Sequence, residues 1–181
     1  MKSGSARIDT SAPWDKRDKS THRFEIADVN GPISLTVPVV KPQSYSSATL
    51  GDIRLSTHGD WPRVHRVTLE SAYGRTPYFE FVFPRFEKFF HSTTVEQFPF
   101  LWQYLAATTA CALEFLQIDA EVKVGEQPED TAEGEPYVSV LPPYWQPRAD
   151  RFGFLPGLSI LDLIFNLGPE ASLYLRKLAA S

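Results

Sequence analysis

The feature that most constrains the fold is a short segment that alternates in polarity and then turns back. Between residues 22 and 28, apolar Phe24 and Ile26 alternate with charged residues, which is the pattern of a half-buried strand. Asn30-Gly31 follows and predicts a type I′ hairpin turn, because both central residues of that turn need positive φ. The β-prone run over residues 33–40 predicts the returning strand. We therefore expect a β-hairpin near the N-terminus.

Helical spacing of apolar residues dominates the rest of the chain. Asp60 and Thr94 are candidate N-caps, Ser159 is expected to cap a short helix, and Gly168 to end it. Helices are expected over residues 61–73, 77–90, 94–116, 160–167 and 169–178, and short strands over 52–55, 121–124 and 137–141. This mixture lacks a regular βαβ rhythm. It predicts an α+β or irregular α/β fold, with a small β-sheet and its hairpin packed against several helices, and a helical C-terminus.

The size and composition of the chain indicate one domain. With 181 residues, of which 43% are apolar, the chain is long enough for one core. Residues 1–21 are polar and predict an extended or disordered lead to a globular domain over 22–181. The acidic, Pro- and Gly-containing stretch at about 126–136 predicts a mobile loop within that domain.

Charge and apolar patterning exclude several classes of partner. The net charge is −4, and seven acidic residues lie between residues 119 and 135, so the rest of the chain is only slightly basic. That is too little for a nucleic-acid footprint. No apolar run approaches the roughly 20 residues of a membrane span, and no signal peptide is visible. A soluble, cytoplasmic protein is expected.

The helix over residues 61–73 carries the candidate catalytic residues. His65 lies on its apolar stripe and could act as a general base if Asp60 or Glu70 oriented it. The alternative is a histidine at the edge of the core, hydrogen-bonded to backbone. His58 precedes the same helix and is the second candidate. The spacing of the two histidines is not that of a helical metal pair, so no metal site is assigned.

Aromatic and cationic residues near this helix are the candidate substrate-binding groups. Trp61, Tyr73 and Tyr78 could stack on a sugar or nucleotide ring, although aromatic residues at helical spacing commonly pack in a core. Arg23 and Arg54 lie in predicted strands and could bind a carboxylate or phosphate, whereas a solvated strand face is the alternative.

No cofactor can be assigned from motifs. The chain has no Gly-rich phosphate loop, nucleophile elbow or dinucleotide fingerprint. Its single cysteine, Cys111, rules out an intrachain disulfide and is expected to be a buried, inert thiol in mid-helix.

Several of these segments together resemble the WbqC-like family of bacterial proteins. The resemblance lies in the order of Ser34-Leu35-Thr36-Val37-Pro38-Val39, Ile53, Trp61, His65, Tyr73 and Pro77-Tyr78-Phe79, in the segment Phe152–Glu170, and upstream in residues 7–26. It covers about residues 7–178. Family members usually carry a further strand and an aromatic-proline loop before the position of Arg7, and this chain lacks that piece. A site group supplied by that piece is expected to be missing.

The resemblance implies a role in surface-polysaccharide biosynthesis. The first hypothesis is a transferase that acts on an activated sugar or acyl donor, with a small-molecule donor or glycan precursor as its partner. His65 would then be the base, Arg23 or Arg54 the anion-binding group, and Trp61 with Tyr73 the ring platform. The alternative is a non-catalytic binding or assembly protein that works as a homo-oligomer, because the aromatic residues of 77–90 exceed what one helix face can bury.

Overall fold

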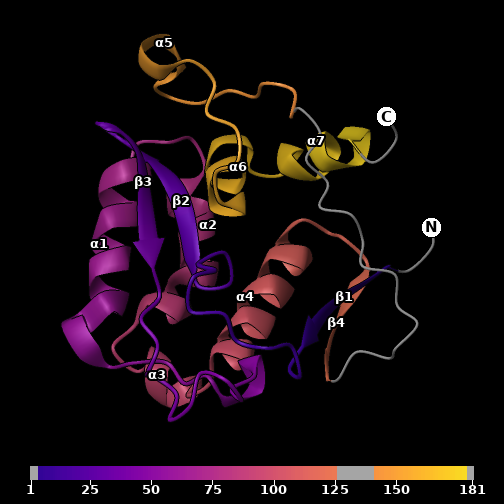
Figure 1. The fold of residues 1–181 in the computed structure, drawn as a ribbon. Helices are drawn as coiled ribbons and strands as arrows, with labels where there is room; N and C mark the ends of the chain where they lie inside the picture. The colour runs from indigo at the N-terminus through magenta and orange to yellow at the C-terminus, as the bar shows by residue number, and fades with distance from the viewer. Residues whose placement is uncertain (1–3, 126–140, 179–181) are drawn as a thin grey trace.

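The computed structural model describes residues 4–125 and 141–178. Its elements in chain order are β1 (Gly4–Asp9), β2 (Arg23–Asp28), β3 (Gly31–Thr36), η1 (Leu50–Asp52), η2 (His58–Asp60), α1 (Trp61–Tyr73), α2 (Phe79–Phe86), η3 (Glu87–Phe90), α3 (Thr94–Gln97), α4 (Leu101–Phe115), β4 (Ala120–Gly125), α5 (Ala149–Phe152), α6 (Ile160–Leu167) and α7 (Glu170–Leu178). The α+β class is confirmed (Figure 1). The acidic loop predicted at 126–136 and most of the strand predicted at 137–141 lie outside the described residues.

The N-terminal hairpin is confirmed, but its turn differs from the prediction. Strands β2 and β3 are antiparallel, and Asp28 lies opposite Gly31, so Val29 and Asn30 form the loop. Gly31 has a φ of 114°, whereas neither loop residue has positive φ. The prediction of a type I′ turn centred on Asn30-Gly31 is therefore wrong. A single left-handed residue after the two-residue loop lets the strands keep their twist, and glycine takes that conformation without strain.

The strands form two separate sheets of two instead of one small sheet. Strand β1 pairs in parallel with β4, from Gly4 opposite Ala120 to Asp9 opposite Gly125. This pair lies beside α4, on the side away from the hairpin (Figure 1). The predicted lead over residues 1–21 is thus extended over β1, and its Trp14 is buried in the core.

A proline divides the helix predicted over residues 94–116. Helix α3 ends at Gln97 and α4 begins at Leu101, with Pro99 between them. A proline disfavours the α conformation in the residue before it, and Phe98 has φ −128° and ψ 74°. The prediction of one continuous helix is wrong for this reason, and so is Thr94 as its cap. The buried Thr94 hydroxyl instead donates to the Lys88 carbonyl, at 3.2 Å.

Other local predictions meet mixed outcomes. Helix α1 begins at Trp61 as expected, and Arg66 pairs with Glu70 at 2.9 Å between Nε and Oε1. Ser159 caps α6 by accepting from the Leu161 N–H. The strand predicted over residues 52–55 is wrong, because this segment makes only isolated bridges after η1.

One cluster of buried side chains runs from Trp14 to Ala171. Phe165 of α6 lies within it, with its ring 5.3 Å from that of Tyr73 and 4.9 Å from that of Phe79. Most aromatic rings of residues 77–90 are buried in the same cluster: Phe79, Phe83, Phe86, Phe89 and Phe90. Phe81 alone among these aromatic residues is largely exposed, at 70%. Helices α2 and η3 therefore bury most of these rings against α4 and α6 within one chain. A contact of the remaining exposed ring, Phe81, with another subunit stays a prediction.

Candidate functional site

His65 lies in the core between α1 and the hairpin. This residue is only 3% exposed. The centroid of its ring lies 5.7 Å from that of Phe24 and 5.2 Å from that of Trp61. The ring donates to the backbone carbonyl of Thr36, while Nδ1 is buried without a hydrogen-bond partner. The two acids expected to orient His65 pair elsewhere: Asp60 binds Arg63, and Glu70 binds Arg66. This geometry agrees with the alternative interpretation, in which His65 is a core histidine hydrogen-bonded to backbone.

Burial fixes the protonation state of His65. Desolvation lowers the pKa of the imidazole from its ordinary 6.5 to about 4, against the smaller opposing effect of the Thr36 carbonyl. The ring is therefore neutral at physiological pH. Because it is covered by Phe24 and Trp61, it has no open surface on which to exchange a proton with a substrate.

The lowered pKa predicts that stability falls in mild acid. Between pH 6.5 and 4 the unfolded chain binds more protons than the folded one, so the stabilisation is complete above pH 6.5 and is lost as the pH falls towards 4. We expect the free energy of unfolding to be about 2 kcal/mol lower at pH 5 than at pH 7 because of His65. Urea unfolding at both pH values measures the difference. The loss of stability between pH 7 and pH 5 should become smaller in His65→Phe and stay unchanged in His58→Ala. An unchanged loss in His65→Phe would contradict the assignment to His65.

His58 does not share a site with His65. It lies in η2, where its side chain is exposed at the start of α1. The nearby indole N–H of Trp61 donates to the Ser56 carbonyl at 2.8 Å, which fixes the ring inward. One histidine is therefore on the surface and the other in the core, and the structure does not bring the two predicted catalytic residues together.

The three predicted aromatic ligands are structural. Trp61 is 3% exposed and Tyr73 is fully buried, so neither presents a ring face to a substrate. Tyr78 packs on α6: a Cβ on Gly168 would lie 2.4 Å from Cδ1 of the tyrosine ring. These residues therefore pack in or against the core, which is the alternative that their helical spacing left open. They do not form a platform for a substrate ring.

Sequence reasoning missed a buried polar cluster around Asp162 of α6. Its Oδ1 accepts from the Tyr73 hydroxyl at 2.8 Å, and its Oδ2 accepts from the Tyr144 hydroxyl at 2.6 Å and the Gln146 amide at 3.0 Å. The Tyr73 hydroxyl in turn accepts from the Ala27 N–H. The available signal was the single acid, Asp162, in a helix whose other residues are apolar except Asn166. This cluster joins the C-terminal segment to α1 and β2, and its geometry is that of a structural link.

The two predicted anion-binding arginines differ in position. Arg54 is exposed, and its guanidinium lies over the Phe100 ring at 4.7 Å. Arg23 donates from Nε to the Thr36 hydroxyl at 3.1 Å. Of all the predicted site residues, Arg23 alone belongs to the lining of the cavity described next.

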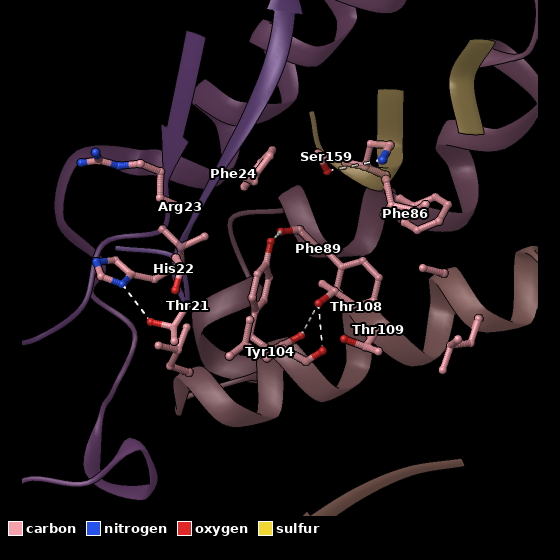
Figure 2. A pocket seen from close by; sticks show the side chains of 18 of the residues that line it. Thr21, His22, Arg23, Phe24, Phe86, Phe89, Tyr104, Thr108, Thr109 and Ser159 are labelled. Carbon is pink, nitrogen blue, oxygen red and sulfur yellow. Dashed lines mark hydrogen bonds between the residues drawn. The ribbon is translucent and has the colours of Figure 1, made fainter. Parts of the chain in front are cut away.

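A cavity of about 490 Å³ lies between the hairpin, α4 and α6 (Figure 2). Its walls are mostly apolar and come from the end of α2, from η3, from α4 and the residue after it, and from α6 and α7. They include Phe86, Phe89, Phe90, Leu101, Leu105, Ala112, Leu113, Leu116, Leu161 and Leu175. Residues 20–23 form one border. The lining follows α4 from Leu101 to Leu113, and Leu116 lies just after the end of that helix. The cavity therefore runs alongside α4, and its walls are mostly apolar.

The polar residues of the lining lie at the border formed by residues 20–23, at Ser159, and at three positions of α4: Tyr104, Thr108 and Thr109. The Thr108 hydroxyl donates to the Tyr104 carbonyl at 2.9 Å, and the Tyr104 hydroxyl faces the Phe89 carbonyl at 3.5 Å. No Asp, Glu, Lys or Cys belongs to the described lining. His22 is in it, but its ring points away from the interior, as does Arg23 (Figure 2). Burial lowers the pKa of His22, so its imidazole is neutral at physiological pH.

The signal for this cavity was present in the sequence. Thr108, Thr109 and Ala112 lie on the same side of the predicted core helix as its large apolar residues. Small side chains there leave space that the bulky ones do not fill. Sequence reasoning treated that side only as core.

The described residues hold neither a cluster of metal ligands nor a membrane-spanning helix. Within residues 4–125 and 141–178, no group of three or more His, Cys, Asp or Glu side chains is placed to hold a metal ion. None of the helices in this part of the chain combines the length and the apolar character needed to cross a membrane.

Comparison with known proteins gives one match. No curated protein and no solved structure matches the chain significantly. A family model does match over residues 12–135, more than half of the chain. That range includes the hairpin, α1 and α4, and it ends before α6, which closes the cavity. The chain therefore belongs to the WbqC-like protein family.

Proposed function

We propose that this protein binds the acyl chain of an activated acyl donor in the cavity beside α4, and that it serves acyl transfer in bacterial surface-polysaccharide biosynthesis. The cavity carries this proposal because it runs alongside α4, is mostly apolar and has a volume of about 490 Å³, within the range of ligand pockets. The polysaccharide context rests on what the family resemblance implies.

The lining favours an acyl group over a sugar. A sugar ring carries hydroxyl groups that must keep hydrogen-bond partners when they leave water, and each unpaired one costs free energy. The walls from α4 and η3 offer only three hydroxyls, and those of Tyr104 and Thr108 already donate to backbone carbonyls, so they can only accept from a ligand. A methylene chain needs none and gains about 0.8 kcal/mol for each buried CH₂.

The proposed reaction needs a base that the cavity does not offer. In acyl transfer, an acceptor oxygen or nitrogen bonds to the donor carbonyl carbon, the bond to the donor's sulfur or oxygen breaks, and the acceptor's proton ends on the leaving group. His65 is too deeply buried to take that proton. The second candidate is therefore a non-catalytic acyl-binding protein, favoured by the absence of an inward-pointing acid or base in the described lining.

The experiment compares ligands of graded chain length. Isothermal titration with acetyl, hexanoyl and decanoyl thioesters of coenzyme A, beside uridine diphosphate glucose, should show an affinity that rises with chain length and little binding of the sugar donor. The expected gain approaches 0.8 kcal/mol, or about fourfold, per methylene until the cavity is filled. Equal affinity for the acetyl and decanoyl thioesters would overturn the proposal.

A pair of variants locates the binding. Ala112→Phe should fill the cavity and remove the dependence on chain length, because Ala112 belongs to the lining. Ala110→Phe is the matched control, since Ala110 is exposed on the same helix. The thermal midpoint of each variant shows that it is folded. Release of free thiol in the presence of an amino- or hydroxyl-sugar acceptor separates transferase from binding protein.

A further inference from the structure

A second hollow adjoins the acyl cavity. It has a volume of about 370 Å³ and is bordered by residues 19–20, 23–25 and 157–159. Ser20, Arg23, Phe24 and Ser159 border both spaces. The apolar cavity and this more polar space therefore lie next to each other, with these four residues at their common border.

The charges around this hollow favour an anion. Lys19 and Arg23 provide two cations against the single carboxylate of Glu25. Lys19 Nζ donates to the Lys16 carbonyl at 2.5 Å, and Arg23 donates from Nε to the Thr36 hydroxyl. Each contact uses only one of the donors of its group, since an ammonium has three and a guanidinium five. Both side chains can therefore bind a further acceptor while they are held in place.

The apolar cavity and the cationic hollow beside it together fit an amphiphilic ligand, with an apolar chain and an anionic headgroup. We propose that the hollow binds a phosphate group on the carrier of the acyl chain, with Lys19 and Arg23 as its ligands. This inference rests on the proposed function, because the chain in the cavity places the carrier at the hollow. A phosphate carries up to two negative charges and three acceptor oxygens, and Arg and Lys are the side chains that commonly bind it.

The test separates the headgroup from the chain. Decyl phosphate and decanol have the same chain, so the ratio of their affinities reports the phosphate alone. We expect decyl phosphate to bind about tenfold more tightly, and the preference to shrink in 0.5 M NaCl, because these cations are partly exposed and screened. Equal affinity of the two probes would overturn this inference while leaving the acyl cavity intact. Binding of neither probe would overturn the proposed function itself.

Variants assign the preference to the two cations. Arg23→Gln and Lys19→Gln should each reduce the preference for decyl phosphate. Lys19→Gln should also leave the affinity for decanol unchanged, because Lys19 borders the hollow and not the acyl cavity. Arg17→Gln is the matched control, because Arg17 is exposed in the same loop and does not border the hollow. An unchanged preference in Arg23→Gln and Lys19→Gln would overturn the assignment. Decanoyl coenzyme A and vesicles that contain phosphatidic acid then distinguish a soluble carrier from a lipid phosphate; binding of either supports the phosphate site.

Discussion

Replacing Asp162 with alanine is expected to lower the free energy of unfolding by about 4 kcal/mol. The carboxylate is fully buried and accepts from Tyr73, Tyr144 and Gln146. Burial raises the pKa of both tyrosine hydroxyls, so they stay protonated donors. Without Asp162, these groups lose a charged acceptor inside the protein, at about 1–3 kcal/mol for each group left unsatisfied.

Urea unfolding at pH 7 measures this loss. Asp162→Asn should cost less, because the amide oxygen can still accept from one hydroxyl. Asp119→Ala is the control, since Asp119 is exposed, and we expect a change within about 0.5 kcal/mol. A loss below 1 kcal/mol in Asp162→Ala would mean that the cluster does not link the C-terminal helices to α1.

Replacing Phe165 with alanine is expected to lower the free energy of unfolding by about 3–5 kcal/mol. This ring is fully buried and lies against Tyr73, Phe79 and Phe83. Its removal loses the transfer free energy of the ring and leaves a cavity that rigid aromatic neighbours cannot collapse to fill.

The matched control is another phenylalanine of the same chain. Phe81→Ala removes an equal ring that is 70% exposed, and its effect should stay within about 0.5 kcal/mol. The two variants are compared by urea unfolding under identical conditions. Similar losses in both would show that Phe165 is not central to packing. Phe165→Leu should lose less than Phe165→Ala, because a smaller cavity remains.

The sequence predicted those elements whose determinants are local. Ser159 and Gly168 bracket α6 as expected, because a hydroxyl N-cap and a glycine with positive φ act within a few residues of the chain. The hairpin followed from alternation over residues 22–28. The split between α3 and α4 also has a local cause, Pro99, but the strong apolar spacing over residues 94–116 outweighed it in the prediction.

The candidate site was harder to predict, because its parts come from distant segments. The apolar spacing that placed His65 and Trp61 together also buries them, and spacing alone cannot tell a core position from a pocket wall. Arg23 borders the cavity only because α6 packs against β2 while α4 forms the opposite wall. The partners of Asp162 come from α1 and from residues 144–146, and no local pattern connects them.

The parallel pairing of β1 with β4 has a consequence for synthesis on the ribosome. The hairpin β2–β3 joins neighbours in the chain and can close as soon as it emerges. Strand β1, although made before the hairpin, must wait until residues 120–125 have been translated. Pairing between such distant segments is slow, because the entropy of closing the intervening loop is lost before any contact forms. Strand β1 therefore pairs after the hairpin that follows it in the chain.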